Sequence, residues 1–437
     1  MSFSQALSGL NAQQQKLGAV GNNIANSQTV GFKSSNVQFA DVYAESRIGL
    51  GVRTSTVLQN FSQGNIESSN RNMDLAIAGE GFFRFQQPNG EVGYSRNGQL
   101  TMTADGDLVN AQGARIMGYG LAAGDDFPFT EVVAGGQPQA LNIPTADMPA
   151  KATENVDMVF NLDSRETAGE GTSTAEVNTD LTTDPVTTAD LTYHFSNNFT
   201  AYDSLGNSHN VTVYYSKSNT PNDWRGQVVM DGFHDPANDF TVGFSSNGTL
   251  QDGVASINGT TINREAVPPD LPTTDIGFGV GANSPLGVDP LPLTFTLNID
   301  GSSQFGNNST TSDLNQDGYT SGSLVGVTIE DDGTVMRNYS NEESRAAGQI
   351  TLVSFRNPEG LQPDGDNLWS ATAASGQELV GAAGTGLRGM IEASAVETSN
   401  VDMAGELVDM IVAQRAYQAN SQTISTQDEL LQTIINL

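Results

Sequence analysis

Apolar side chains recur with alternating spacings of three and four residues at both ends of this chain. Near the N-terminus the stripe comprises Phe3, Leu7, Leu10, Gln14, Leu17, Gly21 and Ile24. Near the C-terminus it comprises Leu407, Met410, Gln414, Tyr417, Ser421, Ile424, Asp428, Leu431 and Ile435, with Ile411, Leu430 and Ile434 beside it. This period places a narrow apolar stripe on one face of a helix. Each end of the chain is therefore predicted to be an α-helix.

The limits of these helices follow from stop and start signals. The first helix is predicted to end by Asn26, because the polar run after it and Gly31 offer a helix stop. The second is predicted to begin with a capping box formed by Ser399 and Asp402. Two interpretations remain open: the helices cap a domain separately, or they pair with each other as a coiled coil. Their common period favours pairing.

Between the two ends the sequence is typical of β-structure. Turn dipeptides separate short apolar runs in a way that suits a meander of hairpins. These dipeptides are Asn89-Gly90, Asn97-Gly98, Asp105-Gly106 and Gln112-Gly113. A second block is predicted to place Val325, Val327 and Ile329 on one face of a strand before the Asp332-Gly333 turn.

The composition changes from about Pro149 to Gly318, where most of the 16 prolines lie. Apolar residues alternate with polar ones in two runs of this segment, as they do in half-buried strands. The first run contains Val211, Val213 and Tyr215, and the second contains Leu293, Phe295, Leu297 and Ile299. We therefore expect an all-β domain inserted into the flanking β domain.

The predicted fold class is mixed and mainly β, with paired terminal α-helices and two nested antiparallel β domains between them. The predicted segments are a helix (1–30), a linker or joint (31–71), the first half of a β domain (72–148), an inserted outer β domain (149–318), the second half of the β domain (319–370), a linker (371–399) and a helix (400–437).

The formal net charge is −32, from 18 Lys and Arg against 50 Asp and Glu. Such a chain repels phosphate backbones and anionic lipid, so we expect neither nucleic-acid binding nor membrane insertion. Residues 1–40 contain Lys16 and Lys33 but no acidic residue, which suggests that this end enters a packed environment. The start of the chain lacks the apolar core of a cleavable signal peptide.

No catalytic, metal or cofactor site is predicted. The chain contains no cysteine, and the three histidines, His194, His209 and His234, lack metal-ligand spacing. The run that begins at Asp313 matches the opening of a calcium loop, but its twelfth position is Leu324 instead of a bidentate carboxylate. This run is therefore predicted to be a solvated turn.

Two terminal motifs, "NNIANSQTVGFK" and "SNVDMAGELVDMIVAQRAYQANSQTISTQDELLQTIINL", together resemble the paired signatures of the flagellar axial family of rod, hook and hook-filament junction subunits. The blocks "GYSRNGQL", "NYSNEESRAAGQITLVSF" and "NPEGLQPDGDNLWSATAASG" resemble the hook subunits within it. The resemblance covers roughly residues 1–147 and 318–437 and is looser between them. Rod subunits share the ends but are typically shorter and lack the large insertion.

The resemblance implies a structural subunit, not an enzyme, that polymerises into a curved tube and acts as a universal joint between rod and filament. It implies that the terminal helices form an inner tube and that the flagellar type III export apparatus secretes the chain. Other implied partners are the distal rod, the hook cap, the hook-filament junction proteins and the hook-length ruler. The alternatives are a distal rod or junction protein or, in another class, a secreted acidic β-rich enzyme or calcium-dependent adhesin.

The residues predicted to mediate self-assembly lie on the two stripes and just after the first helix. They are Phe3, Leu7, Leu10, Leu17, Ile24, Asn26, Gly31, Phe32, Leu407, Ile411, Tyr417, Ile424, Leu431 and Ile434. Helices rich in Asn, Ser and Gly are marginal in water, so residues 1–30 and 400–437 are expected to order only on assembly. Residues 22–39 are predicted to be a joint whose amides bind neighbouring subunits, with a disordered linker as the alternative.

Overall fold

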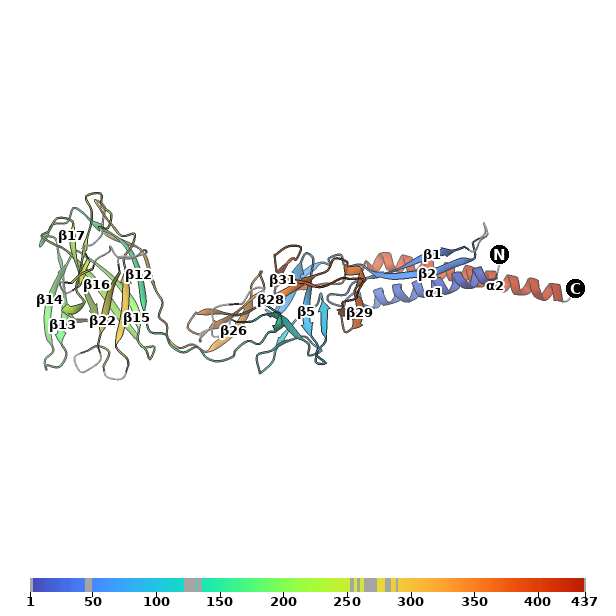
Figure 1. Ribbon diagram of the computed structural model, residues 1–437, viewed down its shortest axis with the longest axis horizontal. Helices are drawn as coiled ribbons and strands as arrows, with labels where there is room; N and C mark the ends of the chain where they lie inside the picture. The colour runs from blue at the N-terminus through green and yellow to red at the C-terminus, as the bar shows by residue number, and fades with distance from the viewer. Residues whose placement is uncertain are drawn as a thin grey trace. The chain divides into compact units, whose positions relative to one another are not determined.

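The computed structural model describes residues 3–43, 49–121, 132, 136–251, 255–257, 260–262, 273–279, 284–287 and 290–435. The chain divides into two compact units. Unit 1 comprises Met1–Ala146 and Leu324–Leu437, and unit 2 comprises Asp147–Ser323. The segment that forms unit 2 therefore separates the two halves of unit 1 in the sequence. Figure 1 shows the elements of both units.

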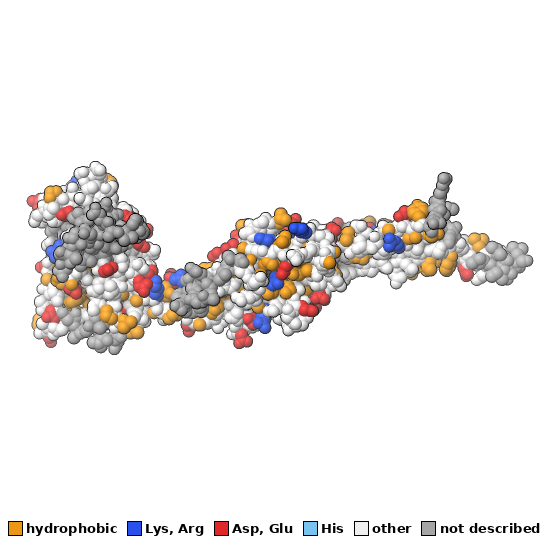
Figure 2. Space-filling view, in the orientation of Figure 1, with side chains coloured by type: hydrophobic (Ala, Val, Ile, Leu, Met, Phe, Trp, Pro, Cys, Tyr) orange, Lys and Arg blue, Asp and Glu red, His pale blue; other side chains and the backbone are white. Residues whose placement is uncertain are grey.

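Unit 1 contains two long helices, one from each end of the chain, α1 (Phe3–Ala25) and α2 (Met403–Ile435). They lie side by side in Figure 1 and run antiparallel, because Gly9 adjoins Asn420 at one end while Asn23 binds Glu406 at the other. The predicted pairing of the terminal helices is therefore confirmed. Hydrophobic side chains nevertheless remain visible on the surface of the paired helices in Figure 2.

The start of α2 differs from the prediction. Asp402 precedes the helix, and its carboxylate accepts a hydrogen bond of 3.1 Å from the N–H of Ala404, as an N-cap does. Ser399 instead accepts a bond of 3.4 Å from the N–H of Val401, in the turn before the helix. The predicted capping box is wrong because an aspartate can serve either as the N-cap or as the third residue of such a box.

The other elements of unit 1 are strands and one short 3₁₀-helix. They are β1 (Ser35–Val42), β2 (Gly51–Gln59), β3 (Ile66–Ser68), β4 (Asp74–Ala78), β5 (Phe82–Gln86), β6 (Val92–Ser95), β7 (Gly98–Gln99), β8 (Thr101–Met102), β9 (Leu108–Val109), β10 (Arg115–Tyr119), β11 (Gln139–Ala140), β26 (Leu324–Ile329), β27 (Thr334–Tyr339), β28 (Ser344–Ser354), η2 (Pro358–Gly360), β29 (Gln362–Gly365), β30 (Leu368–Ser370), β31 (Leu379–Ala382), β32 (Met390–Ala393) and β33 (Ala395–Glu397).

The segments expected to be linkers contain strands. β1 and β2 form an antiparallel hairpin within residues 31–71, and the hairpin lies against α1. The side chain of Gln5 donates a hydrogen bond of 2.6 Å to the carbonyl of Gly49, and the N–H of Val52 donates one of 3.2 Å to Ser8. Residues 371–399 contain β31, β32 and β33. These short strands carry no strong alternation of apolar residues, so the sequence pattern misses them.

A twelve-stranded sheet forms the centre of unit 1 and follows the path β26-β27-β28-β10-β5-β6-β30-β29. Strands β10, β5 and β6 of the first half lie between β26–β28 and β30–β29 of the second half. Ile350 of β28 lies opposite Gly118 of β10, and Leu352 lies opposite Phe83 of β5. Apolar side chains from both halves then share one core. Its members include Leu75, Ile77, Phe85, Ile116, Leu141, Val335, Ile350 and Ile391.

Three of the four predicted hairpin dipeptides form turns. Gly90, Gly106 and Gly113 have φ angles of 87°, 87° and 80°, which glycine adopts without strain. Asn97-Gly98 is the exception, because Gly98 begins β7, which pairs with β4. A side chain at Gly98 would clash with the carbonyl oxygen of Leu75, so this glycine permits close backbone approach instead of a turn.

The predicted face of β26 is also only partly correct. Val327 and Ile329 are buried, whereas Val325 is 72% exposed. A bulge lies between Leu324 and Gly326 where the strand pairs with β27. Such a bulge adds one residue and reverses the alternation of side chains, so Val325 lies on the opposite face from Val327 and Ile329.

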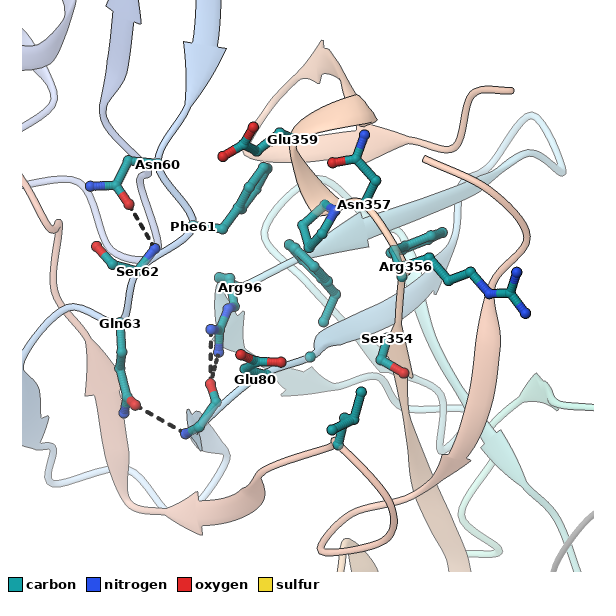
Figure 3. A pocket seen from close by; sticks show the side chains of 16 residues that line it. Asn60, Phe61, Ser62, Gln63, Glu80, Arg96, Ser354, Arg356, Asn357 and Glu359 are labelled. Carbon is teal, nitrogen blue, oxygen red and sulfur yellow. Dashed lines mark hydrogen bonds between the residues drawn. The ribbon is translucent and has the colours of Figure 1, made fainter. Parts of the chain in front are cut away.

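A smaller aromatic cluster adjoins the main core of unit 1. The ring of Phe82 packs edge-on against Phe61, Phe355 and Trp369, with centroid separations of 5.3, 6.0 and 6.0 Å. Edge-to-face packing at these distances is favourable for aromatic rings. One side of the cluster opens into the pocket drawn in Figure 3, where Phe61 lies at the rim.

Unit 2 is built from strands and one short 3₁₀-helix. They are β12 (Asn155–Asp163), β13 (Ser173–Asp180), β14 (Thr187–Tyr193), β15 (Phe195–Tyr202), β16 (Ser208–Lys217), β17 (Asp223–Met230), β18 (Phe233–His234), η1 (Pro236–Asn238), β19 (Phe240–Gly243), β20 (Ala255–Ile257), β21 (Thr260–Ile262), β22 (Thr273–Phe278), β23 (Leu293–Asn298), β24 (Ser303–Phe305) and β25 (Thr310–Gln316).

Two sheets of nine and five strands enclose the core of unit 2. The alternations predicted from the sequence are confirmed, because Val211, Val213, Tyr215, Leu293, Phe295, Leu297 and Ile299 are all buried. The pairing is not wholly antiparallel, since β12 runs parallel to β23 and β24. The chain reaches β23 from β12 by way of the other sheet, and crossovers of this kind join parallel strands.

Unit 2 begins and ends in segments that pair with each other. The N–H groups of Met148 and Gly322 donate to each other's carbonyls, at 2.7 and 3.0 Å. Lys151 and Tyr319 exchange two hydrogen bonds of 3.0 Å each. Residues 148–151 and 319–322 therefore form a two-stranded antiparallel strap, named here the paired strap.

Candidate self-assembly surface

The contact between α1 and α2 uses small and polar side chains. The ammonium of Lys16 lies 3.2 Å from the carboxylate of Asp409, and the amide of Asn23 lies 2.9 Å from the carboxylate of Glu406. Ala413 of α2 is almost completely buried. Several large apolar side chains of the two helices nevertheless stay exposed and are left for another surface.

That other surface lies on the outer side of the helices. Six large apolar side chains of α2 are exposed, namely Met403, Leu407, Val408, Ile411, Val412 and Leu430, and so are Phe3 and Leu7 of α1. The first five of these follow one another within three helical turns, and we call them the exposed helix face. Leu407 and Ile411 are 46% and 52% exposed. A contiguous apolar patch of this kind is typical of a protein–protein contact.

The residues predicted for self-assembly differ in how exposed their side chains are. Phe3, Leu7, Leu407 and Ile411 are exposed, Leu10, Leu17, Ile24, Asn26, Phe32, Tyr417 and Ile424 are partly buried, and Gly31 is buried. The side chains of Leu431 and Ile434 lie outside the described residues. The predicted α2 stripe thus mixes two faces, because Tyr417 and Ile424 lie on the less exposed side with Ala413, whereas Leu407 and Ile411 point outward. The part these residues play in assembly stays a prediction.

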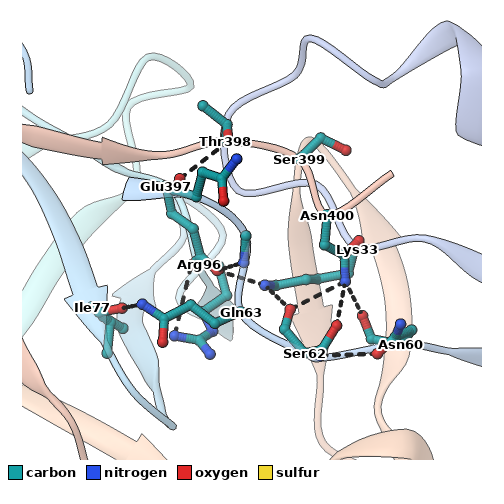
Figure 4. Close-up of polar contacts among 12 residues, drawn as sticks. Lys33, Asn60, Ser62, Gln63, Ile77, Arg96, Glu397, Thr398, Ser399 and Asn400 are labelled. Carbon is teal, nitrogen blue, oxygen red and sulfur yellow. Dashed lines mark hydrogen bonds and ion pairs between the residues drawn. The ribbon is translucent and has the colours of Figure 1, made fainter. Parts of the chain in front are cut away.

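The segment that follows α1 enters a buried polar junction (Figure 4). The ammonium of Lys33 lies 2.6 Å from Glu397 Oε1 and 2.7 Å from the carbonyl of Ser62. The N–H of Gly64 donates to the same carboxylate oxygen at 2.8 Å. Arg96 lies 3.6 Å from the other carboxylate oxygen. We call these five residues the Lys33–Glu397 junction, and it joins the segments that lead out of α1 and into α2.

Two cations share one carboxylate in this junction. Burial lowers the pKa of Lys33, and the nearby negative charge of Glu397 only partly offsets that effect. Burial likewise lowers the pKa of Arg96, whose guanidinium also donates two hydrogen bonds of 2.9 Å to the carbonyl of Gly79. Each member of the junction therefore depends on the others to offset the free energy lost on leaving water.

Gly31 allows the chain to reach this junction. Its φ angle is 71°, and its N–H donates a hydrogen bond of 2.7 Å to the carbonyl of Glu397. A Cβ atom at this position would lie 2.6 Å from the backbone nitrogen of Asn97. Both the backbone angle and the close approach therefore require glycine.

The amides around the predicted joint form hydrogen bonds within the chain. The side chain of Asn23 accepts a bond of 2.9 Å from the N–H of Ser35, and that of Asn400 accepts one of 2.8 Å from the N–H of Ser34. The side chain of Asn26 donates to the carbonyl of Asn22. These bonds use part of the hydrogen-bonding capacity of the amides within the chain, and their binding to neighbouring subunits stays a prediction.

Sequence patterns missed Arg96, Glu397 and Asn400 as partners of the N-terminal segment. One signal was available: Lys33 stands in a stretch of 40 residues without an acid, so any carboxylate that pairs with it must come from outside that stretch. The sequence alone offers no means of choosing that carboxylate among 50 acidic residues.

Unit 2 holds two histidines in contacts with carboxylates. His209 Nδ1 lies 2.7 Å from Asp231, and His234 Nε2 lies 2.8 Å from Asp239. Among the residues that the structure describes, no three His, Asp or Glu side chains are placed to hold a metal ion.

The run that resembles a calcium loop is mainly a strand. Residues Thr310–Gln316 form β25, which pairs with β12. Asp317 follows the strand, and its carboxylate accepts hydrogen bonds of 2.8 and 2.9 Å from the N–H groups of Glu154 and Asn155 and one of 2.8 Å from Lys151. The predicted solvated turn is therefore wrong for β25, and Asp317 instead ties the paired strap to β12.

Four family models match the chain. They are the flagella basal body rod protein at residues 4–33, the flagellar hook protein FlgE/F/G D1 domain at 76–158, the flagellar basal body protein FlaE D2 domain at 161–319, and the flagellar basal body rod FlgEFG protein C-terminal at 392–437. The rod matches cover parts of α1 and α2, and the D2 match falls in unit 2.

Curated relatives match along the whole chain. The flagellar hook protein FlgE of Escherichia coli (strain K12) is 42% identical, with 100% of each chain covered. The flagellar hook protein FlgE of Borreliella burgdorferi is 33% identical, with 100% of this chain and 99% of the relative covered. Among solved structures, Helicobacter pylori flagellar hook protein FlgE2 is 14% identical with a TM-score of 0.49, and the match covers 76% of this chain and 100% of that chain.

Paired terminal helices, an outward apolar face and β domains between them define a self-polymerising subunit of the flagellar axial structure. The chain belongs to the flagellar hook protein family, whose members are structural subunits and not enzymes. Its place is therefore the flagellum. No helix in the described part of the chain has both the length and the apolar character needed to span a membrane.

Proposed function

We propose that this chain polymerises into the curved, flexible tube of a bacterial flagellar hook and transmits torque from the rod to the filament. The observation that carries the proposal is the exposed helix face, which no described residue of the same chain covers. Burying apolar surface is worth roughly 25 cal/mol per Å². A neighbouring copy that covers this face therefore supplies a driving force for assembly.

Ordering of the chain ends is coupled to this step. The exposed helix face lies outside the contact between α1 and α2, so this apolar surface adds no free energy to pairing within one chain. We therefore propose that residues 1–30 and 400–437 are largely disordered in the free chain and become helical on assembly. Binding that occurs only in the ordered state shifts the folding equilibrium toward that state.

Unit 2 supplies an outer layer whose contacts between copies can shift. Residues 161–320 carry 20 acidic and 4 basic side chains, so contacts through this region are wet and repulsive instead of apolar and locked. A bendable tube needs an inner contact that holds while outer contacts slide. Deletion of residues 149–318 is expected to leave a straighter or more flaccid tube. Complete loss of polymer would instead assign an essential structural role to unit 2.

We propose further partners from the resemblance to this family. They are the distal rod, the hook cap, the hook-filament junction proteins, the hook-length ruler and the flagellar type III export apparatus, which would carry the chain out of the cell without cleaving it. The match of residues 4–33 and 392–437 to rod models supports axial contacts through the same helices.

The test combines a deletion strain with electron microscopy. Cells that lack the gene are expected to lack hooks, and the wild-type chain is expected to restore them. The double variant Leu407→Ser/Ile411→Ser should not restore hooks, whereas Gln414→Ser, an exposed polar position of the same helix, should. Normal hooks from the double variant would refute assembly through the exposed helix face.

Two other outcomes would assign another function. A deletion strain that still builds hooks but lacks the distal rod or the filament junction would indicate a rod or junction subunit. Purified chain that forms no tubes when salted out, but acts on or adheres to an external substrate, would indicate the secreted enzyme or adhesin.

A further inference from the structure

A pocket of about 910 Å³ lies in unit 1 beside the aromatic cluster (Figure 3). Five separate segments contribute its walls: the stretch after β2, the turn between β4 and β5, the turn between β6 and β7, the end of β28 with η2, and the loop between β31 and β32. None of the residues of the exposed helix face lines it. The pocket is therefore a second candidate contact surface, separate from the helices.

The floor of this pocket is apolar. Phe82 and Phe355 are buried beneath it, and Phe61 packs against Phe82 at its edge with a centroid separation of 5.3 Å. Leu387 stands on the rim and is 72% exposed, which is unusual for a leucine beside an aromatic floor. An apolar group that enters here would bury part of Leu387 and the open side of the aromatic cluster.

The charges in the pocket are balanced. Two arginines and two glutamates line it: Arg96, Arg356, Glu80 and Glu359. Arg96 already donates to the carbonyl of Gly79, and Glu80 lies beside it in Figure 3. Arg356 is exposed and makes no hydrogen bond or ion pair with a described residue. On a chain with a net charge of −32, this is a region where a second acidic chain can approach without repulsion and can offer a carboxylate to Arg356.

We propose that this pocket receives a second copy of the chain, which inserts an apolar side chain over the aromatic floor. The inference rests on the proposed polymer, because copies of the chain surround one another there. Contacts in an open helical polymer join two different surfaces, so the pocket meets a part of the neighbour other than its own pocket. The copies would then be held by two contacts, one on the helices and one on the β-structure of unit 1.

The test uses a photo-crosslinking amino acid at Leu387 in hooks that form in cells. Illumination of these hooks is expected to give covalent dimers of this chain, and illumination of the soluble monomer is not. In parallel, Leu387→Ser is expected to raise the critical concentration for polymerisation of the purified chain about tenfold, which corresponds to about 1.4 kcal/mol. Val325→Ser is the matched control, because Val325 is also 72% exposed but does not line the pocket.

The outcomes separate this inference from the proposed function. Hooks that form normally, yield no dimers from position 387 and tolerate Leu387→Ser as well as Val325→Ser would overturn the pocket contact alone. A crosslink from position 387 to a different protein would also overturn it. If Leu407→Ser/Ile411→Ser forms hooks normally, helix-driven assembly fails, whatever the pocket does.

Discussion

The ammonium group of Lys33 lies 2.6 Å from a carboxylate oxygen of Glu397, although the two residues are 364 positions apart in the sequence. Both side chains are completely buried. The pair ties the segment after α1 to the segment before α2, so the two ends of the chain meet at a fixed point of unit 1. Arg96 shares the same carboxylate, which makes Glu397 the residue on which both cations depend.

Removal of Glu397 is therefore expected to destabilise unit 1 more than removal of Lys33. Glu397→Gln leaves two buried cations without a counter-charge, and breaking a buried pair in this way costs about 3–5 kcal/mol. Lys33→Met leaves the Arg96–Glu397 pair and is expected to cost less. Urea unfolding followed by tryptophan fluorescence measures both.

The control for these variants is Lys16→Met, which removes the partly exposed pair with Asp409. An exposed pair contributes less than about 1 kcal/mol. The expected order of destabilisation is Glu397→Gln, then Lys33→Met, then Lys16→Met. If Glu397→Gln and Lys16→Met lower the free energy of unfolding equally, burial of the Lys33–Glu397 junction adds nothing to stability.

Gly31→Ala is expected to destabilise unit 1 by at least about 1–3 kcal/mol, since it forces a side chain into the left-handed backbone region and toward Asn97. Gly18→Ala is the matched control in α1, where a Cβ would meet nothing within 4 Å. In the polymer, where α1 is helical, that change is expected to favour the helix by about 0.5–1 kcal/mol. Thermal unfolding and hook formation in cells measure both, and normal motility with Gly31→Val would contradict a constrained joint.

Amide hydrogen exchange tests the proposed coupling of order and assembly. In dilute monomer, the amides of α1 and α2 are expected to exchange rapidly, while those of β28 and β16 stay protected. In the polymer, both helices are expected to become protected. Helices that are already protected in the monomer would show that the ends fold without neighbours.

Acid is expected to weaken unit 2 through Asp317. Partial burial raises the pKa of Asp317, but hydrogen bonds from the N–H of Asn155 and from the ammonium of Lys151 outweigh this effect and hold the pKa at about 2. A carboxyl group with a lowered pKa stabilises the fold above its unfolded value of 3.8, and this stabilisation is lost as the pH falls toward the folded value. The free energy of unfolding should therefore decrease between about pH 4 and pH 2.

Asp317→Asn is expected to remove part of this pH dependence and to lower stability near neutral pH. Asp313→Asn, at an exposed position of the neighbouring strand, is the control and is expected to leave both unchanged. Chemical unfolding at a series of pH values distinguishes the two. If the free energy of unfolding of Asp317→Asn depends on pH as steeply as that of the unmodified chain, the acid sensitivity belongs to other carboxyl groups.

The sequence predicted those elements whose pattern is local. The three-and-four spacing identified both helices, and strict alternation identified the strands that bury Val211 and Leu293. For α2, the contact face predicted from the same spacing is only partly correct. Ala413 and polar groups contact α1, whereas Leu407 is exposed. Periodicity shows that a helix has an apolar stripe but does not show which neighbour covers it.

The Lys33–Glu397 junction could not be predicted, because nothing in either local sequence specifies the other. Lys33 stands among amides and hydroxyls, and Glu397 is the last residue of a short strand without a strong pattern. Long-range ion pairs depend on how distant segments are brought together, which local propensity does not encode. The prediction that Val325 shares a buried face with Val327 and Ile329 was wrong for a related reason. The bulge beside Val325 depends on pairing with the next strand.

The paired strap holds the first and last residues of unit 2 together as a two-stranded ribbon. Because Met148 bonds to Gly322 and Lys151 bonds to Tyr319, neither strand of the strap can rotate alone without breaking hydrogen bonds to the other. A single strand rotates freely about its backbone single bonds, whereas a short ribbon of two hydrogen-bonded strands resists twisting. Both ends of unit 2 are thus held at one place, and a force on either end is shared by the other.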